Sequence, residues 1–249
     1  MGIKSTQTLI GISEVLKDHE EGLGVTALAD ELGMAKSTIH NHLSTLEEHG
    51  FVVNDDGTYR LGLRFLDFGM ATRNSSRVYQ VAKPKVDELS ASIEQKVWCM
   101  VEQQGRGVRL YVSDYNDKLQ TNAYIGQRTY LHQSAAGKAI LAHLPERRVD
   151  EIIERVGLPE ATSETITERD ELFEELSEIR DRGVAFNQGE SVWGLTGVGA
   201  PIRDKDGNVL GSVSVAAASN IMKDSRLRSE LSEQLLGTIN EIEINLTHN

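Results

Sequence analysis

The chain has 249 residues, of which 39% are hydrophobic, and it carries a formal net charge of −12 and one cysteine. This length allows two ordinary domains, each with its own core. A single cysteine excludes an internal disulfide and a cysteine-only metal cluster. There is no apolar run long enough to span a bilayer and no signal-peptide pattern at the start, so we expect a cytoplasmic protein without a membrane partner.

Three helices are predicted within the first 50 residues. An amphipathic pattern over residues 3 to 19 predicts the first. Thr26 is a candidate N-cap for a short second helix, and Gly33 can end that helix because glycine tolerates a left-handed backbone. Residues 35 to 49 predict a third helix, whose core-facing residues recur at i, i+4 and i+7: Ile39, Leu43 and Leu46.

A short hairpin is predicted after the third helix. Residues 51 to 53 begin an extended run, Asp56 and Gly57 suit a two-residue turn, and Tyr59 and Leu61 alternate on the return strand. Helices with a tight connector followed by a hairpin predict a winged helix-turn-helix that reads DNA. The candidate DNA contacts are the polar residues of the exposed helix face and the wing: Lys36, Ser37, Thr38, His40, Asn41, Ser44 and Arg60.

The charge of this segment argues against nucleic acid as the partner. Residues 1 to 62 hold ten carboxylates and four basic side chains, whereas proteins that neutralise phosphates are usually basic. Two explanations remain open. Either the host keeps a high internal salt concentration, in which acidic surfaces are common and phosphate attraction is screened, or the winged helix binds another protein. The rest of the chain is acidic too, which favours the first explanation.

The remaining chain predicts a linker followed by an α+β domain. Helical patterns over residues 64 to 70 and 78 to 89, with Pro84 as a kink, predict the linker. Beyond it, β-rich runs and helical patterns predict an antiparallel sheet flanked by helices. The strands are expected at 97–102, 108–113, 184–186, 198–202 and 209–217, and the helices at 134–144, 146–156, 167–182 and 225–246. The predicted domains are 1–68, 69–92 and 93–249.

The segment from Gln133 to Ile140, QSAAGKAI, is the first candidate binding site. It lacks the earlier glycine and the Ser or Thr after lysine that a phosphate-binding P-loop needs. The free backbone N–H groups of Ala135 and Ala136 at a helix start could instead hold a small anion. An ordinary Ser134 N-cap packed against the sheet explains the same residues equally well.

Other stretches add candidate pocket residues but no catalytic group. Ser212 and Ser214 share one face of a predicted strand and offer either a pair of ligand hydroxyls or a solvent-facing side. Asn187, Glu190 and Leu195 lie in a Gly-rich segment that suits a pocket rim. His132 near Ser134 suggests a hydrolytic triad, but no Gly-x-Ser-x-Gly elbow is present. The histidine spacing predicts no metal site.

Four separated blocks of this sequence resemble the IclR family of transcription regulators. They are AKSTIHNHLSTLEEHGFVV, YRLGLRFLDFG, LHQSAAGKAILAHLP and IRDRGVAFNQGESVWGLTGVGAPIRDKDGNVLGSVSVA. The resemblance implies an N-terminal winged helix, a linker helix used in dimerisation, and a GAF-like C-terminal domain that binds a small, often carboxylate-bearing metabolite. It also implies homodimers or homotetramers on palindromic DNA.

Carried over by position, the resemblance implies individual ligand contacts. Ala135 and Ala136 would donate backbone N–H groups, Leu195 would line the pocket, and Ser212 and Ser214 would supply hydroxyls.

Asn187 stands where many members of the family have Asp, and Gly197 stands where Cys is common. We therefore expect a ligand different from the small keto acids that some members bind. In the third helix Asn41 replaces the usual Arg, and Asn can still read adenine. We therefore predict a ligand-responsive DNA-binding regulator without cofactor, metal or enzymatic activity. A protein-interaction module and an enzyme are the alternatives.

Overall fold

A computed structural model describes residues 2–115, 122–218 and 225–248. The outermost residues of the predicted terminal domains, Met1 and Asn249, lie outside this description. The chain divides into two compact units, Met1–Thr72 and Arg73–Asn249, which are described separately.

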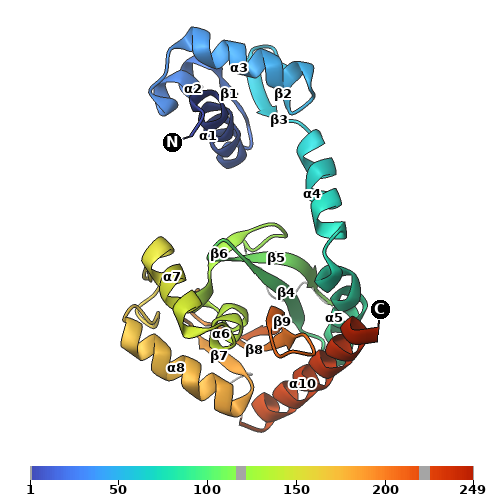
Figure 1. Cartoon of the computed structure of the whole chain (residues 1–249). Helices are drawn as coiled ribbons and strands as arrows, with labels where there is room; N and C mark the ends of the chain where they lie inside the picture. The colour runs from blue at the N-terminus through green and yellow to red at the C-terminus, as the bar shows by residue number, and fades with distance from the viewer. Residues whose placement is uncertain (1, 116–121, 219–224, 249) are drawn as a thin grey trace. The chain divides into compact units, whose positions relative to one another are not determined.

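In the first unit, helices α1, α2 and α3 pack against a small antiparallel sheet of order β1-β3-β2 (Figure 1), and residues 64–72 begin the next helix. Its core lies between the helices and the sheet and includes Ile12, Leu28, Ile39 and Leu43, all completely buried. The elements are α1 (Lys4–Asp18), β1 (Leu23–Gly24), α2 (Val25–Leu32), α3 (Lys36–Glu48), β2 (Val52–Asp55) and β3 (Thr58–Leu61).

Turn chemistry defines the connections of this unit. Gly33 ends α2 in the left-handed conformation, with φ 61°, as predicted. Asp56 and Gly57 form a two-residue turn with φ values of 48° and 86°, which agrees with the positive φ of a type I′ turn. The prediction of Thr26 as an N-cap is wrong, because Gly24 occupies that position and makes no side-chain cap. Gly24 also belongs to β1, a strand that was not predicted.

The linker consists of two helices, α4 (Arg64–Asn74) and α5 (Arg77–Ile93). The two helical patterns predicted at 64–70 and 78–89 lie within these two helices. Helix α5 starts anew because the Ser76 hydroxyl accepts a hydrogen bond from the Tyr79 N–H at 3.3 Å. Pro84 lies inside α5 without ending it.

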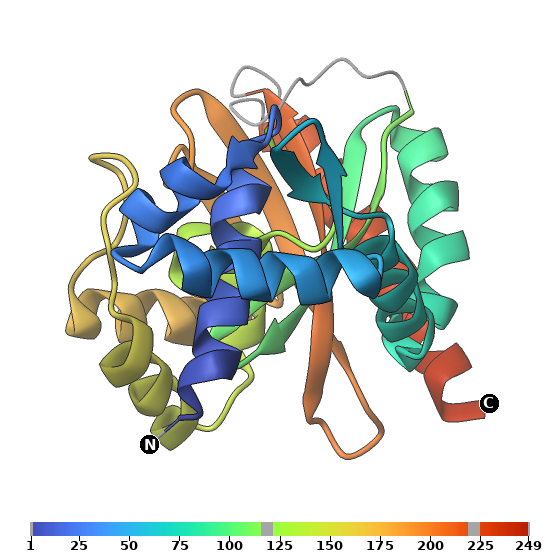
Figure 2. The same ribbon diagram turned by 90° about the horizontal axis from the view of Figure 1, so that it is seen from above.

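The second unit is built on a six-stranded sheet of order β6-β5-β4-β9-β8-β7, in which all neighbours are antiparallel. Figure 2 shows β8 and β9 as a long hairpin. The predicted α+β architecture is confirmed. The strands are β4 (Lys96–Gln103), β5 (Arg106–Ser113), β6 (Arg128–Tyr130), β7 (Ala185–Gln188), β8 (Leu195–Arg203) and β9 (Val209–Ala218). A 3-10 turn (Leu131–Gln133) precedes α6 (Ala135–Ala142), followed by α7 (Glu146–Val156), α8 (Arg169–Arg182) and α10 (Ser225–His248).

The two faces of this sheet bury different cores. One face packs against α5 and α10 and includes Cys99, Val213 and Val215. The other packs against α6, α7 and α8 and includes Met100. Cys99 is completely buried among these core residues, as predicted, and burial raises the pKa of its thiol to about 12.

A β-bulge interrupts the β4–β5 pairing. Cys99 pairs with Tyr111 and Met100 pairs with Arg109, so Leu110 is an extra residue on β5. Without the bulge, residues 109 and 111 would share a face. Tyr111 instead packs with the α5 core and its hydroxyl donates to Asp87 at 2.7 Å, while Arg109 lies on the α6 face.

Candidate ligand cavity and nucleic-acid interface

A cavity of about 290 Å³ lies on the α6 face of the sheet. Its wall combines the start of α6 with strands β4, β8 and β9 and with the segments that precede β6 and β8. The lining residues that matter most below are Trp98, Arg109, Gln127, Ala135, Ala136, Asn187, Ser191, Leu195, Gly197 and Ser214.

The start of α6 supplies free donors to this wall. The Ser134 hydroxyl accepts from the Gly137 N–H at 3.1 Å, so the predicted N-cap is confirmed. The Ser134 carbonyl accepts from the Lys138 N–H, so the N–H groups of Ala135 and Ala136 come before the first helical donor and have no acceptor within the helix. Two glycines let this helix approach its neighbours. A Cβ at Gly137 would lie 2.1 Å from the Leu131 carbonyl oxygen, and one at Gly199 would lie 2.7 Å from Ala135 backbone atoms.

Six of the seven predicted ligand residues line the cavity: Ala135, Ala136, Asn187, Leu195, Gly197 and Ser214. Ser212 does not. It shares a face with Ser214 as predicted, but it sits two residues along β9, paired with Met100 and Pro201 and completely buried.

Asn187 has a structural task as well. Its side-chain amide donates to the Gln133 carbonyl at 2.6 Å and accepts from the Gly189 N–H at 3.1 Å. It therefore fastens the loop after β7 to the segment before α6. This leaves less of the Asn187 side chain for a ligand than the sequence alone suggests.

A buried ion pair holds the loop that follows β7 against α6. Lys138, 2% exposed, donates to the Glu190 carboxylate at 2.8 Å and to Glu175 at 3.3 Å. Burial raises the pKa of Glu190, while the Lys138 charge opposes that shift. Because Ser191 lines the cavity next to Glu190, this pair fixes part of the cavity wall.

Sequence reasoning missed several cavity residues, of which Arg109 is the most consequential. Its guanidinium carbon lies 4.5 Å from the centroid of the Trp98 ring, a cation–π contact. Strand alternation gives no signal for it, because the bulge at Leu110 turns Arg109 to this face. Gln127 precedes β6, a strand that was not predicted.

The hydrolytic interpretation gains no support from the geometry. His132 is buried, its Nε2 lies 3.1 Å from the Pro159 carbonyl oxygen, and burial lowers its pKa. The Ser134 hydroxyl is engaged as a helix cap. Both side chains are thus engaged in hydrogen bonds to the backbone.

The predicted DNA contacts lie mainly on one exposed face of α3. Ser37, His40, Asn41 and Ser44 are exposed and spaced at i, i+3, i+4 and i+7, and Lys36 is exposed at the helix start. Thr38 is half-buried and borders a groove shared with α1. The buried residues of α3 are the three that were predicted: Ile39, Leu43 and Leu46.

The wing arginine is already paired within the chain. Arg60 donates to Asp55 at 3.0 Å across the wing, and both side chains are exposed. Exposed pairs of this kind contribute little stability. A phosphate could therefore displace Asp55 at small cost.

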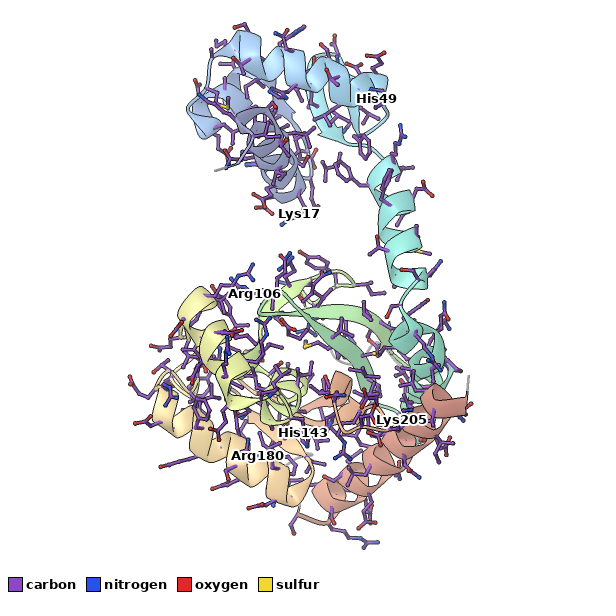
Figure 3. All side chains as sticks on the ribbon, viewed as in Figure 1. Lys17, His49, Arg106, His143, Arg180 and Lys205 are labelled. Carbon is purple, nitrogen blue, oxygen red and sulfur yellow. The ribbon has the colours of Figure 1, made fainter. Side chains whose placement is uncertain are left out.

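A second basic residue ties α3 to α4. The Arg64 guanidinium donates to the carbonyl of His49, which ends α3 and is labelled in Figure 3. The same guanidinium lies 4.9 Å from the Phe51 ring centroid, and Phe51 packs edge-on against Phe65 at 5.0 Å. The end of α3 and the start of α4 are thus held together.

Comparison with known proteins gives a consistent assignment. The model described as "IclR helix-turn-helix domain" matches residues 12–56, and that described as "Bacterial transcriptional regulator IclR C-terminal" matches residues 70–244. A relative from Halobacterium salinarum, the probable HTH-type transcriptional regulator ArcR, is 34% identical over 98% of this chain and 94% of its own.

Solved structures agree in fold. The Thermotoga maritima IclR crystal structure has a TM-score of 0.79 at 25% identity and covers 98% of both chains. An IclR homologue from Microbacterium hydrocarbonoxydans, complexed with 4-hydroxybenzoate, has a TM-score of 0.83 at 21% identity and covers 98% of this chain and 99% of its own.

A helix-turn-helix unit joined to a domain with a small-molecule cavity defines a ligand-responsive DNA-binding transcription regulator. The chain belongs to the IclR family. The family assignment decides between the DNA-binding and the protein-interaction interpretations in favour of the first. Among the described residues, no helix is both long and apolar enough to cross a membrane.

Proposed function

We propose that α3 reads DNA bases and that a small polar metabolite in the α6 cavity controls this reading. Lys36, Ser37, Thr38, His40, Asn41 and Ser44 meet the major groove and Arg60 meets a phosphate. The protein acts in the cytoplasm and releases its metabolite unchanged. The supporting observation is the exposed polar face of α3, whose opposite face is wholly committed to the core.

We also propose that the protein works as a homodimer or homotetramer on a palindromic operator. Helix α4 supports this, since none of its residues is buried within the chain while Leu66 and Phe68 are 61% and 52% exposed. Apolar side chains this exposed on one helix mark an interaction surface. Two copies joined there would present two recognition helices to two half-sites.

The DNA-reading helix is tested by a gel shift against the DNA upstream of the protein's own gene, at high salt. Asn41→Ala combined with Ser37→Ala should weaken specific binding at least tenfold, because each of the two lost base contacts costs about 1–3 kcal/mol. Ser229→Ala, an exposed serine on α10, is the matched control. Unchanged affinity of the double variant would remove α3 from the assignment.

The residues proposed to hold the metabolite line the cavity: Ala135, Ala136, Asn187, Leu195, Gly197 and Ser214. Ser212, which does not line it, lies two residues from Ser214 on the same face of β9. The Microbacterium relative, which was solved with 4-hydroxybenzoate, makes that compound a rational first probe for this chain.

A further inference from the structure

One face of helix α4 contacts the residues that end α3. The Arg64 guanidinium donates to the carbonyl of His49, the C-cap of α3, and lies 4.9 Å and 5.9 Å from the ring centroids of Phe51 and Phe68. The Phe51 ring also packs against the Phe65 ring, with 5.0 Å between the centroids. A charge-assisted hydrogen bond and three aromatic side chains therefore fix this face of α4 against the end of α3.

The backbone is also closely packed at this junction. The Gly62 N–H donates to the Phe51 carbonyl at 2.7 Å, and a Cβ at Gly62 would lie 2.3 Å from the Gly50 carbonyl oxygen. Gly50 follows the end of α3 with a φ of 72°, and its N–H donates to the Glu47 carbonyl at 2.9 Å. The chain that enters α4 thus lies directly on the chain that leaves α3, so backbone and side chains restrain the same angle.

The opposite face of α4 is apolar and exposed. Leu63, Leu66 and Met70 fall within an arc of about 60° at 100° per residue, on the other side of the helix from Arg64. Their side chains are 84%, 61% and 38% exposed. An exposed apolar stripe suits the proposed pairing of two copies through α4. One helix would then connect the pairing surface directly to α3.

This arrangement relates the angle between α3 and α4 to the spacing of the DNA half-sites. In a dimer paired through α4, that angle sets the separation of the two copies of α3. Each base pair inserted between two half-sites moves one of them by about 3.4 Å and turns it by about 35°. A rigid angle therefore allows both copies of α3 to bind at one spacing, whereas a loose angle allows several.

We propose that Arg64 is a positioning residue that determines which half-site spacing the dimer accepts. It acts through the His49 carbonyl and the Phe51 ring, which hold α3 at a fixed angle to α4. The planar, permanently charged guanidinium of arginine can bond a carbonyl and stack on a ring at the same time, and a cation is favoured at the C-terminal end of a helix. This inference rests on the proposed function and adds the determinant of operator spacing.

The test measures affinity as a function of half-site spacing, with the full-length protein at high salt. The wild-type protein first selects its site from a pool of random-sequence DNA. That site is then rebuilt with one or two base pairs inserted or removed at its centre, and also as a single half-site. The wild type should bind the two-base-pair variants at least about tenfold more weakly than the selected site, because the second half-site can no longer be engaged.

Variants of the junction should reduce this preference for one spacing. Arg64→Met removes the guanidinium but keeps an unbranched apolar side chain, and it should bind the same variants at most about threefold more weakly than the selected site. Arg64→Lys should give an intermediate ratio, because an ammonium can donate to the same carbonyl but lacks the planar fork. Phe65→Leu loosens the junction without a change of charge and should act in the same direction as Arg64→Met.

The control is Arg155→Met, the same chemical change at an exposed arginine of α7. It should keep the wild-type ratio between spacings. The affinity of Arg64→Met for the single half-site should match wild type, because positioning affects only the joint binding of two half-sites. A lost phosphate contact or a partly unfolded protein would instead weaken binding to every probe by the same factor and leave the ratio unchanged.

The ratio between spacings therefore decides the outcome. A wild-type ratio in Arg64→Met, or in Phe65→Leu if the first variant does not fold, overturns the inference. Selection of no site by the wild type, or equal wild-type affinity at all spacings, overturns the proposed DNA recognition or the proposed pairing, and the inference with it. The wild-type measurements thus test the proposed function, and the variants test the role of Arg64.

Discussion

Lys138 shows how one side chain can stabilise both a core and a binding wall. It is completely enclosed and shares its charge between Glu190 and Glu175. Removing one member of a buried pair leaves the other charged and unpaired, and that loss exceeds the net value of the pair itself.

We therefore predict that Lys138→Met lowers the free energy of unfolding by about 3–5 kcal/mol. Adding Glu190→Gln to this variant should recover part of the loss. Arg147→Met, which breaks the exposed Arg147–Glu151 pair, should cost less than about 1 kcal/mol. Urea denaturation measures all three, and equal costs for the two single variants would contradict the prediction.

Glu190 also makes a prediction about pH. Burial raises its pKa above the ordinary 4.5, so the folded protein keeps this proton at pH values where the unfolded chain has lost it. The stability contributed by this group is then greatest at low pH and falls as the pH rises above about 4.5.

The wild type should consequently lose stability relative to Glu190→Gln as the pH rises from below the ordinary pKa of 4.5 to above it. Urea denaturation of both proteins across this range measures the difference, in which effects common to the two cancel. A wild type that gains stability relative to the variant as the pH rises would show that the Lys138 charge outweighs burial.

At the scale of elements, the approach of α6 to the sheet depends on Gly199. A Cβ at this position would lie 2.7 Å from the Ala135 carbonyl carbon and oxygen. Gly199→Ala should cost about 1–3 kcal/mol through overpacking and should shift the start of α6. Gly237, exposed within α10 with open space around it, is the matched control.

Gly237→Ala should raise stability by about 0.5–1 kcal/mol, because alanine is the better helix former. Opposite signs for one chemical change, measured by thermal unfolding, would separate the close contact from helix propensity. Two changes of the same sign would contradict this explanation.

Periodicity and turn residues predicted most elements, while residues far apart in sequence decided the exceptions. The wing, the α3 core face and the Ser134 cap follow from local pattern. Gly24 starts α2 because β1 pairs with β3, a long-range contact that no local signal announces. A bulge turns the Arg109 side chain to the cavity face of the sheet, and strict alternation along the strand does not predict a bulge. Ser212 was placed in the cavity because a shared strand face says nothing about where the cavity ends.

At the scale of the whole molecule, the charge of −12 shapes how DNA is bound. The proposed contacts include two basic side chains per chain, Lys36 and Arg60. Each neutralised phosphate adds about −0.9 to the slope of log affinity against log salt, so a dimer should show a slope no steeper than about −4. Filter binding from low to high salt measures it, and a slope near −8 would reveal phosphate contacts beyond these residues.

The affinity of such a regulator for DNA would depend more on contacts to base edges and on the relative placement of the two DNA-binding units than on attraction to the phosphates. The tie between Arg64 and the end of α3 matters here, because it makes the recognition helix move with the start of α4. The break between α4 and α5, at Ser75 and Ser76, lies C-terminal to this contact.

The cavity also contains its own optical reporter. The chain has two tryptophans. Trp98 lies in the cavity wall under Arg109, and Trp193, 74% exposed, belongs to the loop that holds Ser191 and Val192 at the cavity. A ligand that draws the Arg109 guanidinium away from the Trp98 ring changes the emission of this buried indole. A movement of the loop changes the emission of the exposed Trp193 indole. Intrinsic fluorescence can therefore follow occupancy and loop movement as two separate signals in an unlabelled protein.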